Sequence, residues 1–576
     1  MATAELITDN NGKERIAVKI HLREKSLIKQ VPGARYDAEL GVWTTRKAYT
    51  ACVQLSNIFR NALEVSTELK EYAQGEYTKT IAQRERGLLL DAELQHWREG
   101  EMSPLQRVGA GFLAGAESAI LADEMGAGKT VQATVAVDIV IMLNDIATLN
   151  ERFHGLAVVP NSTKRGWARH IDEWTLSVRP YVLKGNKKQR LEIIEAFKAD
   201  KRAMLIANWE QLRAHSRLAP YGNIRLTDEE RTPKEFNDFE FDVIIADEAH
   251  RAKNASSKQT RGLWAPKAKR KWAMTGTPIA NHPGDLWSIL HFIDPDEWPS
   301  RSAYIDRYCL TQWNVHGGMD IVGIRYDTRD EFYHLIDRYF LRRLKRDIMG
   351  RDIVKVPEVR YVELPPKHRK MYKEFKEELL LMLENGAISA TNPLAATSRL
   401  VQLSAAPLDM TDEGKYVMVK PSPKVAELLS LVEAVEEPVV VFSASKQLLY
   451  LAAEELEKKG IPYLFASGDQ GEDERAEAVE RFQAGEGTVF LATQGAMSEG
   501  VTLTRAKVLC FLQRDWSMVK NKQAEDRIHR WGQEADSVTI VDIITEDTID
   551  ERVYEVFTTK EGRLDEVTRD SWKELL

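Results

Sequence analysis

Cysteine is scarce in this chain of 576 residues. Cys52, Cys309 and Cys510 lie far apart and no C-x-x-C pair occurs, which excludes a disulfide-built scaffold and a cysteine-based zinc module. Long hydrophobic runs are also missing: none reaches about 18 residues, and the first residues, MATAELITDNNGKE, lack the pattern of a signal peptide. From these absences we expect a soluble, intracellular protein with no membrane partner.

The chain has no excess of positive charge either. Its 80 Lys and Arg are outnumbered by 88 Asp and Glu, for a formal net charge of −8. As a sum this argues against a nucleic-acid partner, but a partner meets local patches rather than totals. Residues 251–272 hold eight Lys and Arg and no acid. They predict a basic surface that contacts phosphates, with a plain solvated face as the alternative.

What the sequence does contain is two series of short apolar runs between amphipathic stretches. The first series comprises residues 119–123, 156–160, 203–207, 242–246 and 271–275, and the second comprises 438–443, 463–467, 488–493, 507–512 and 537–544. Strands that alternate with helices predict parallel sheets covered on both faces. Because about 160 residues separate the series, we expect two α/β domains.

These patterns divide the chain into five parts. The expected bounds are a small α+β unit over 1–60, a helical linker over 61–100, a first α/β lobe over 101–345, a helical connector over 346–420 and a second α/β lobe over 421–576. The connector is inferred because no comparable strand series appears there.

A glycine-rich loop follows the first apolar run, in LADEMGAGKT at 121–130, and a helical stretch follows the loop. Gly126 and Gly128 would let backbone N–H groups curl around phosphate oxygens at the start of that helix. Lys129 would reach the β- and γ-phosphates, and the Thr130 hydroxyl would bind Mg²⁺. A glycine turn with an exposed lysine is the alternative.

Two acids, Asp247 and Glu248, end another apolar run. A carboxylate at the carboxyl end of a strand beside a phosphate loop can hold Mg²⁺, and its neighbour can orient and deprotonate the attacking water. Two acids that cap a helix are the alternative.

Together with further motifs, these elements resemble a superfamily-two helicase motor, and in particular the Swi/Snf-type ATPase family. The likeness lies in PLQRVGAGFL, VVPNSTKRGWARHIDEW and TGTP of the first lobe, and in ATQGAMSEGVTLTRA and QRDWSMVKNKQAEDRIHRWGQ of the second. About a dozen motifs occur in the family's order over residues 104–556, and Asp123 agrees with the family's D-E-M-G-x-G-K-T form.

The resemblance implies nucleotide contacts in both lobes. Gln106 would bind the adenine, and Gln523 would also contact the nucleotide. Arg527 and Arg530 would reach across the cleft to ATP bound on the first lobe, where such arginines are typically worth about 10³–10⁵ in rate. Their spacing of three residues places both on one face of a helix.

The resemblance also implies DNA contacts, at Lys164, Thr275 and Thr493 of the motor. Near the N-terminus, KQVPGARYDAELGVWTTRKAY is similar to the small accessory repeat that precedes the motor in annealing helicases. We therefore expect Arg35 and Trp43 to grip DNA, with a β-unit that only props the motor as the alternative.

The expected fold is α/β, with two RecA-like parallel-sheet lobes that form a helicase motor and a small N-terminal α+β accessory domain. The expected function is ATP- and Mg²⁺-dependent translocation on double-stranded or forked DNA, in replication or repair. We expect a monomer, with replication or repair proteins as further partners, in the cytoplasm of a bacterial or viral source or in the nucleus if the source is eukaryotic. The alternatives are a strand-separating DNA or RNA helicase and a nucleotide-gated DNA-binding scaffold with little turnover.

Overall fold

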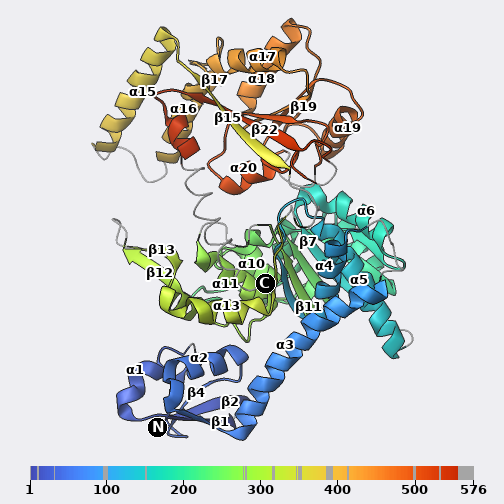
Figure 1. Cartoon of the computed structure of the whole chain (residues 1–576), viewed down its shortest axis with the longest axis vertical. Coiled ribbons are helices and arrows are strands. Elements are labelled where there is room, and N and C mark those ends of the chain that lie inside the picture. The colour runs from blue at the N-terminus through green and yellow to red at the C-terminus, as the bar shows by residue number, and fades with distance from the viewer. Residues whose placement is uncertain are drawn as a thin grey trace. The chain divides into compact units, whose positions relative to one another are not determined.

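The chain forms two compact units that divide near residue 344 (Figure 1). The computed structural model describes residues 2–9, 12–31, 33–94, 102–148, 152–276, 278, 282–313, 318–344, 347, 353–384, 393–411, 414–496, 501–530 and 533–555.

Unit 1 opens with a small five-stranded sheet. Its strands are β1 (Ala2–Thr8), β2 (Glu14–Lys19), β3 (Arg35–Asp37), β4 (Val42–Arg46) and β5 (Leu63–Val65), in the order β3-β4-β2-β1-β5. The pairs are antiparallel except β1 with β5. We call residues 2–65 the accessory domain; it ends five residues beyond the predicted bound because β5 completes its sheet.

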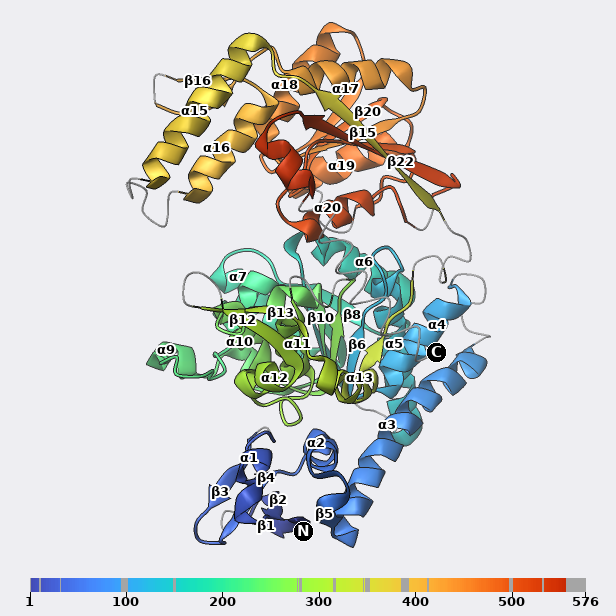
Figure 2. The ribbon, with the colours of Figure 1, turned by 60° about the vertical axis from the view of Figure 1, so that its left-hand side comes forward.

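Three helices accompany this sheet: α1 (Lys25–Ile28), α2 (Tyr49–Phe59) and the long α3 (Thr67–Leu94). α3 occupies most of the predicted helical linker and packs against α4 (Pro104–Gly115) of the following lobe (Figure 2).

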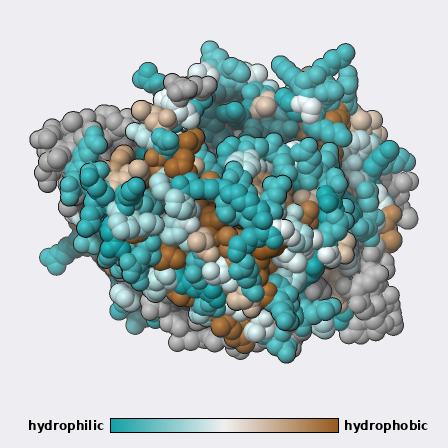
Figure 3. All heavy atoms as spheres, turned by 90° about the horizontal axis from the view of Figure 1, so that it is seen from above, coloured by the Kyte–Doolittle hydropathy of each residue, from teal (hydrophilic) through white to brown (hydrophobic). Residues whose placement is uncertain are grey.

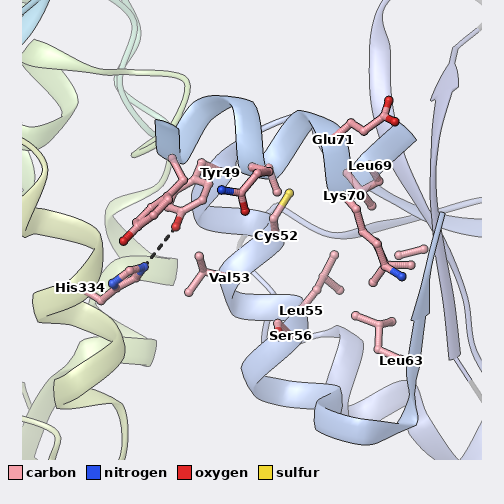
Figure 4. A pocket seen from close by; sticks show the side chains of 15 residues that line it. Tyr49, Cys52, Val53, Leu55, Ser56, Leu63, Leu69, Lys70, Glu71 and His334 are labelled. Carbon is pink, nitrogen blue, oxygen red and sulfur yellow. Dashed lines mark hydrogen bonds between the residues drawn. The ribbon is translucent and has the colours of Figure 1, made fainter. Parts of the chain in front are cut away.

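The accessory domain packs against the first lobe through α2. Gln54 Nε2 donates to the Tyr308 hydroxyl at 2.7 Å, and the Tyr49 hydroxyl lies 3.1 Å from His334 Nε2. Figure 4 shows this second contact at one end of a mostly apolar cavity of about 750 Å³ between α2, β5 and α3. The cavity lining contains Cys52, whose thiol pKa is raised to about 12 by burial and by the negative charge of Glu297.

The first lobe contains a seven-stranded, all-parallel sheet in the order β14-β6-β11-β10-β7-β9-β8. Its strands are β6 (Ser118–Leu121), β7 (Phe153–Val159), β8 (Arg179–Val182), β9 (Arg202–Asn208), β10 (Glu240–Asp247), β11 (Lys267–Met274) and β14 (Phe340–Leu341). All five predicted runs form strands, and buried side chains from one face of the sheet form a core with the helices packed on that face.

Helices cover this sheet. They are α4, α5 (Lys129–Thr148), α6 (Lys164–Trp174), α7 (Lys187–Ala199), α8 (Leu212–His215), α9 (Asp228–Arg231), α10 (Lys258–Trp264), α11 (Leu286–Ile293), α12 (Arg301–Tyr308) and α13 (Arg329–Asp337). A hairpin of β12 (Cys309–Trp313) and β13 (Met319–Ile324) extends this lobe.

Unit 2 contains a six-stranded parallel sheet in the order β15-β22-β21-β18-β20-β19. Its strands are β15 (Val354–Val362), β18 (Val439–Ser443), β19 (Tyr463–Ala466), β20 (Val489–Thr493), β21 (Val508–Gln513) and β22 (Ser537–Thr545). Alternate residues of the inner strands face two separate cores, one on each side of the sheet.

The strand β15 corrects the prediction that residues 346–420 form a purely helical connector. It lies at the edge of the sheet and pairs with β22 along its whole length. Pro357 and three half-buried charged residues, Lys355, Glu358 and Arg360, interrupt its apolar pattern, as an edge strand tolerates.

The rest of unit 2 is mainly helical. Its helices are α15 (Pro366–Glu384), α16 (Pro393–Ala405), α17 (Pro423–Ala434), α18 (Lys446–Lys458), α19 (Glu472–Gln483) and α20 (Met518–Glu525), with a small hairpin of β16 (Leu408–Met410) and β17 (Tyr416–Met418).

A buried lysine ties α17 to the sheet of unit 2. Lys424 is fully buried, and its Nζ donates to the carbonyl oxygens of Leu512 at 2.8 Å and Ile543 at 2.6 Å and pairs with Asp550. All three donors of the ammonium are satisfied, which is the condition for keeping such a charge inside a protein.

Across the described residues, no helix combines the length and apolar character needed to cross a bilayer. On the face drawn in Figure 3, hydrophilic residues predominate and hydrophobic ones appear in separate patches.

Candidate functional site

The glycine-rich loop lies between the end of β6 and the start of α5, as predicted. Gly126 and Gly128 have φ values of +80° and +76°, a region that L-residues with side chains rarely adopt. A Cβ atom at position 128 would lie 2.4 Å from Gln106 Nε2. The structure therefore places the Gln106 amide against the loop and requires glycine there.

Lys129 is the first residue of α5, and its side chain turns back over the loop. Lys129 Nζ donates to the carbonyl oxygens of Asp123 at 2.8 Å and Glu124 at 3.1 Å. Thr130 lies in the same first turn of the helix. A cation, a hydroxyl and a helix N-terminus are thus gathered at one loop, which is the donor set that a triphosphate with Mg²⁺ requires.

A buried ion pair that was not predicted supports this loop from behind. Arg343 Nε and backbone N–H both donate to Asp123 Oδ1 at 3.0 Å, and Arg343 Nη2 donates to Gln132 Oε1 at 2.8 Å. Arg343 also bonds the carbonyl oxygen of Leu105. The sequence signal was Asp123 itself, an acid directly after a buried strand, since a buried carboxylate needs a partner.

The two acids at the end of β10 have different surroundings. Asp247 is buried and accepts a hydrogen bond from Trp167 Nε1 at 2.9 Å. Glu248 adopts the left-handed conformation, with φ +51° and ψ 49°, and its N–H donates to Asp247 Oδ1 at 3.0 Å. A non-glycine residue in this region is held there by its surroundings and is common at functional sites.

Glu248 is linked to the strand β11 through a histidine. His250 Nδ1 lies 3.2 Å from Glu248 Oε2 and 3.2 Å from Thr275 Oγ1. Thr275 is 0% exposed, and its backbone N–H donates to the carbonyl oxygen of Leu121. The structure thus buries the Thr275 hydroxyl inside the lobe beside His250, and it gives no support to the predicted DNA contact at this residue.

Lys164 also differs from its prediction as a DNA contact. It is only 8% exposed, and its Nζ donates to the carbonyl oxygen of Leu183 at 3.2 Å. Thr493, at the end of β20, is half-buried, and its Oγ1 accepts from the Ala496 N–H at 3.3 Å. The Lys164 ammonium is therefore engaged inside the lobe and is not presented to a DNA phosphate. Thr493 remains partly accessible to solvent.

The predicted contacts of the accessory domain lie at its surface. Arg35 is exposed in β3. Trp43 is half-buried in β4, and its ring meets that of Tyr36 edge-on, with centroids 5.7 Å apart. Tyr36 is 58% exposed. Two neighbouring aromatic rings at a surface suit stacking with nucleic-acid bases, whereas Arg35, the residue next to Tyr36 in β3, points to the opposite face of the sheet.

The basic segment 251–272 does not form a continuous free surface. Three of its cations pair with carboxylates elsewhere: Arg251 with Glu210, Lys258 with Glu230 and Lys269 with Asp242. Arg261 is buried and donates to the carbonyl oxygen of Ala219 at 2.9 Å. Burial also lowers the pKa of Lys271. The prediction of a phosphate track at this segment is therefore not supported.

In unit 2, two arginines converge on one backbone oxygen. Arg527 Nη1 and Arg530 Nη1 donate to the carbonyl oxygen of Val501 at 3.2 and 2.9 Å. Burial, followed by the positive charge of Arg527, lowers the pKa of Arg530 to about 10. Two cations held this close leave positive potential that an anion would relieve.

The arginines lie in a turn rather than on a helix, which corrects the geometry inferred from their spacing. α20 ends at Glu525, and residues 526–530 form the turn that we call the arginine turn. Gln523 lies within α20 and is buried, so the structure places this predicted nucleotide contact inside unit 2.

Comparison with protein families finds two matches that together cover most of the chain. The SNF2-related domain matches residues 60–408, and the helicase conserved C-terminal domain matches residues 423–532.

Several proteins are similar to this chain. The ISWI chromatin-remodeling complex ATPase ISW1 of Saccharomyces cerevisiae is 26% identical over 81% of this chain and 40% of its own length. The SWI/SNF-related matrix-associated actin-dependent regulator of chromatin subfamily A-like protein 1 of Xenopus tropicalis is 25% identical over 96% of this chain and 54% of its own length. The chain thus spans about half or less of the length of these relatives.

Among solved structures, the Sulfolobus solfataricus SWI2/SNF2 ATPase core in complex with double-stranded DNA is similar to this chain. It is 21% identical, covers 82% of this chain and 94% of that one, and has a TM-score of 0.36.

Proposed function

Because the chain belongs to the SNF2-related family, we propose that it is an ATP-driven translocase on double-stranded DNA that remodels or reanneals forked DNA in replication or repair. The observation that carries the proposal is the glycine-rich loop, where Gly126 and Gly128 hold left-handed backbone beneath Lys129. The similarity to a chromatin-remodelling ATPase of Saccharomyces cerevisiae supports ATP turnover.

In this proposal Lys129 and the loop N–H groups bind the β- and γ-phosphates of ATP. Thr130 and Asp247 would hold Mg²⁺, which when bound neutralises charge on the phosphate oxygens. Glu248 orients the attacking water and accepts its proton, and His250 fixes the direction of the Glu248 carboxylate.

The paired arginines complete the chemistry. Arg527 and Arg530 present concentrated positive charge that would stabilise the charge spreading over the γ-phosphoryl oxygens. Their convergence on Val501 supports this role, since both guanidinium groups are held in place before any anion arrives. Preorganised charge of this kind costs no rearrangement at the moment of reaction.

The accessory domain supports a forked DNA substrate. Arg35 and Trp43 provide a cation and an aromatic ring on its surface. Because the Xenopus relative aligns with 96% of this chain, the likeness includes most of the residues before Val65. We propose that this domain grips the single-strand to duplex junction while the motor moves along the duplex.

Steady-state ATP hydrolysis with different nucleic acids tests the proposal. The full chain is assayed with no nucleic acid, single-stranded DNA, duplex DNA, forked DNA and RNA, with Lys129→Ala as the control that removes the phosphate contact. Stimulation by duplex and forked DNA is expected. Stimulation by RNA alone would contradict DNA translocation, and no stimulated turnover would indicate a nucleotide-gated scaffold.

Strand displacement separates translocation from conventional unwinding. On a partial duplex with one labelled strand, the proposed enzyme hydrolyses ATP without releasing the strand. ATP-dependent release would identify a strand-separating helicase instead. On a fork with separated complementary arms, reannealing is expected, and Trp43→Ala should weaken fork binding more than it weakens duplex binding.

A further inference from the structure

A buried network of charges ends at the arginine turn of unit 2. Glu525, the last residue of α20, accepts from Arg514 Nη1 at 3.0 Å and from Lys355 Nζ at 2.8 Å. Arg514 also forms two bonds to Asp542, at 2.6 and 2.8 Å. Glu525, Arg514 and Asp542 are all buried. The end of the short helix α20 is therefore held by side chains from the sheet: Lys355 lies in β15, Asp542 lies in β22, and Arg514 directly follows β21.

The Glu525 carboxylate is ionised in this setting. Burial alone opposes ionisation, but Lys355 and Arg514 outweigh it and leave the pKa of the carboxyl below its ordinary value. Lys355 and Arg514 each donate one charge-assisted hydrogen bond to Glu525, and two parallel hydrogen bonds to Asp542 fix the Arg514 guanidinium in turn. This joint of buried charges is stiffer than an exposed ion pair.

The backbone of Glu525 is the origin of the arginine turn. Its carbonyl oxygen accepts from the N–H groups of Ile528 at 3.3 Å and His529 at 3.2 Å. His529 Nε2 in turn bonds the carbonyl oxygen of Ile353, at 2.8 Å, just before β15. The turn is therefore fastened both to Glu525 and to the same edge of the sheet that supplies Lys355.

We propose that Glu525 is the positioning residue of the arginine pair: Arg514 and Lys355 fix its carboxylate, and through it the end of α20, so that Arg527 and Arg530 are aimed at the transferred phosphoryl group. The inference rests on the proposed ATPase function. It assigns Glu525 no contact with nucleotide; the residue acts only through the arginines.

The test compares two isosteric substitutions that each remove one buried carboxylate charge. Glu525→Gln alters the joint at the arginine turn. Asp550→Asn alters the buried pair with Lys424 in the same unit, and it serves as the matched control because neither residue contacts the turn in the described structure. Both variants are assayed for ATP turnover with duplex DNA, at a temperature where circular dichroism shows both fully folded.

Glu525→Gln should lower kcat by about 10- to 100-fold, the effect typical of a misplacement near 1 Å. The KM for ATP should change by less than about two-fold, because the phosphate loop still binds the nucleotide. Asp550→Asn should keep kcat within about two-fold of the wild type. Equal losses of kcat in the two variants would overturn the proposal, because the effect would then be one of general stability.

A double-mutant cycle isolates the route through the arginines. In an Arg527→Ala/Arg530→Ala background, Glu525→Gln should cause no further loss of kcat, since the groups that it positions are gone. An undiminished loss in that background would overturn the proposal. If Glu525→Gln does not fold, Lys355→Met, at a half-buried side chain, should give a smaller loss that vanishes in the same background.

The proposed function fails separately from this inference. A wild-type chain without DNA-stimulated turnover, or an arginine double variant with normal turnover, would refute the proposed role of the arginines. Normal turnover in Glu525→Gln together with loss in the arginine double variant would refute the positioning role alone.

Discussion

The carboxylate of Glu297 accepts hydrogen bonds from the backbone N–H groups of Tyr49 and Thr50, both at 2.7 Å, across 248 and 247 residues of sequence. It caps the N-terminus of α2, where the N-cap residue, Ala48, has no side chain that could do so. Arg338 pairs with the same carboxylate at 3.2 Å. A residue of the first lobe thus completes a helix of the accessory domain.

We expect Glu297→Gln to destabilise unit 1 by about 3 kcal/mol, because it leaves Arg338 buried without its counter-ion and weakens the cap. Urea unfolding followed by tryptophan fluorescence measures the loss. The neighbouring Asp296 is the matched control: its side chain is 90% exposed, and Arg46 lies 3.8 Å from it. Asp296→Asn should change stability by less than about 0.5 kcal/mol, and equal losses in the two variants would contradict the capping role.

Two glycines in helices of the first lobe should respond in opposite directions to alanine. A Cβ at Gly109 would lie 1.8 Å from Gln132 Oε1 and 2.6 Å from Arg343 Nη2, whereas a Cβ at Gly166 meets nothing within 4 Å. Gly109→Ala should cost about 1–3 kcal/mol by overpacking and lower ATP turnover by displacing the support of the phosphate loop. Gly166→Ala should stabilise by about 0.5–1 kcal/mol. A stabilised Gly109→Ala in thermal unfolding would contradict the tight packing behind the loop.

Thr275→Val distinguishes two roles of Thr275: a buried contact with His250, which lies beside Glu248, and a contact with DNA. Removal of the hydroxyl deprives His250 of one partner, so the Glu248 carboxylate loses part of its orientation. Turnover should fall by about 10- to 100-fold, less than the roughly 10²–10⁴-fold that general base catalysis contributes, because Glu248 itself is retained. Duplex affinity, measured by fluorescence anisotropy without ATP, should stay unchanged. A fall in affinity with normal turnover would support the predicted DNA contact at Thr275 instead.

A buried histidine predicts a loss of stability in acid. Burial lowers the pKa of His215, whose Nε2 accepts from Arg190 Nε at 2.9 Å and whose Nδ1 lies 3.2 Å from Glu235. Because the unfolded chain binds a proton at about pH 6.5 and the folded chain only at lower pH, the contribution is full above about pH 6.5 and is lost as the pH falls below it.

His215→Gln isolates this effect, since an amide can accept from Arg190 and donate to Glu235 without titrating. Urea unfolding at pH 7.5 and 5.5 should show a larger loss of stability on acidification in the wild type than in the variant. An identical pH dependence in both proteins would contradict the prediction.

Buried parts of the fold were the most predictable from sequence. Inner strands such as β10 and β18 are covered on both faces and therefore read as continuous apolar runs. The edge strand β15 was missed because Pro357 and three charged residues interrupt its run of apolar residues. An apolar run therefore predicts a strand that is buried on both faces far better than it predicts an edge strand of the same sheet.

The candidate site divides in the same way. The positions of Gly128 and Lys129 follow from a local motif between a strand and a helix. The burial of Thr275 and Lys164 does not follow from their motifs, because a motif identifies residue types but not which of them face solvent. The cap that Glu297 provides for α2 could not be predicted from the sequence. The only local sign of it is negative: Ala48 occupies the N-cap position, where a residue with a capping side chain is usual.

The rate at which Lys424 reacts with an acylating reagent reports how often unit 2 opens. An acylating reagent attacks a neutral, accessible amine, and this ammonium is enclosed by Leu512, Ile543 and Asp550. Exposed lysines react at once, so slow acylation of Lys424, followed by mass spectrometry, times the opening of unit 2 even while unit 1 stays folded. One buried charge thereby makes the lifetime of the folded unit 2 measurable without an engineered probe.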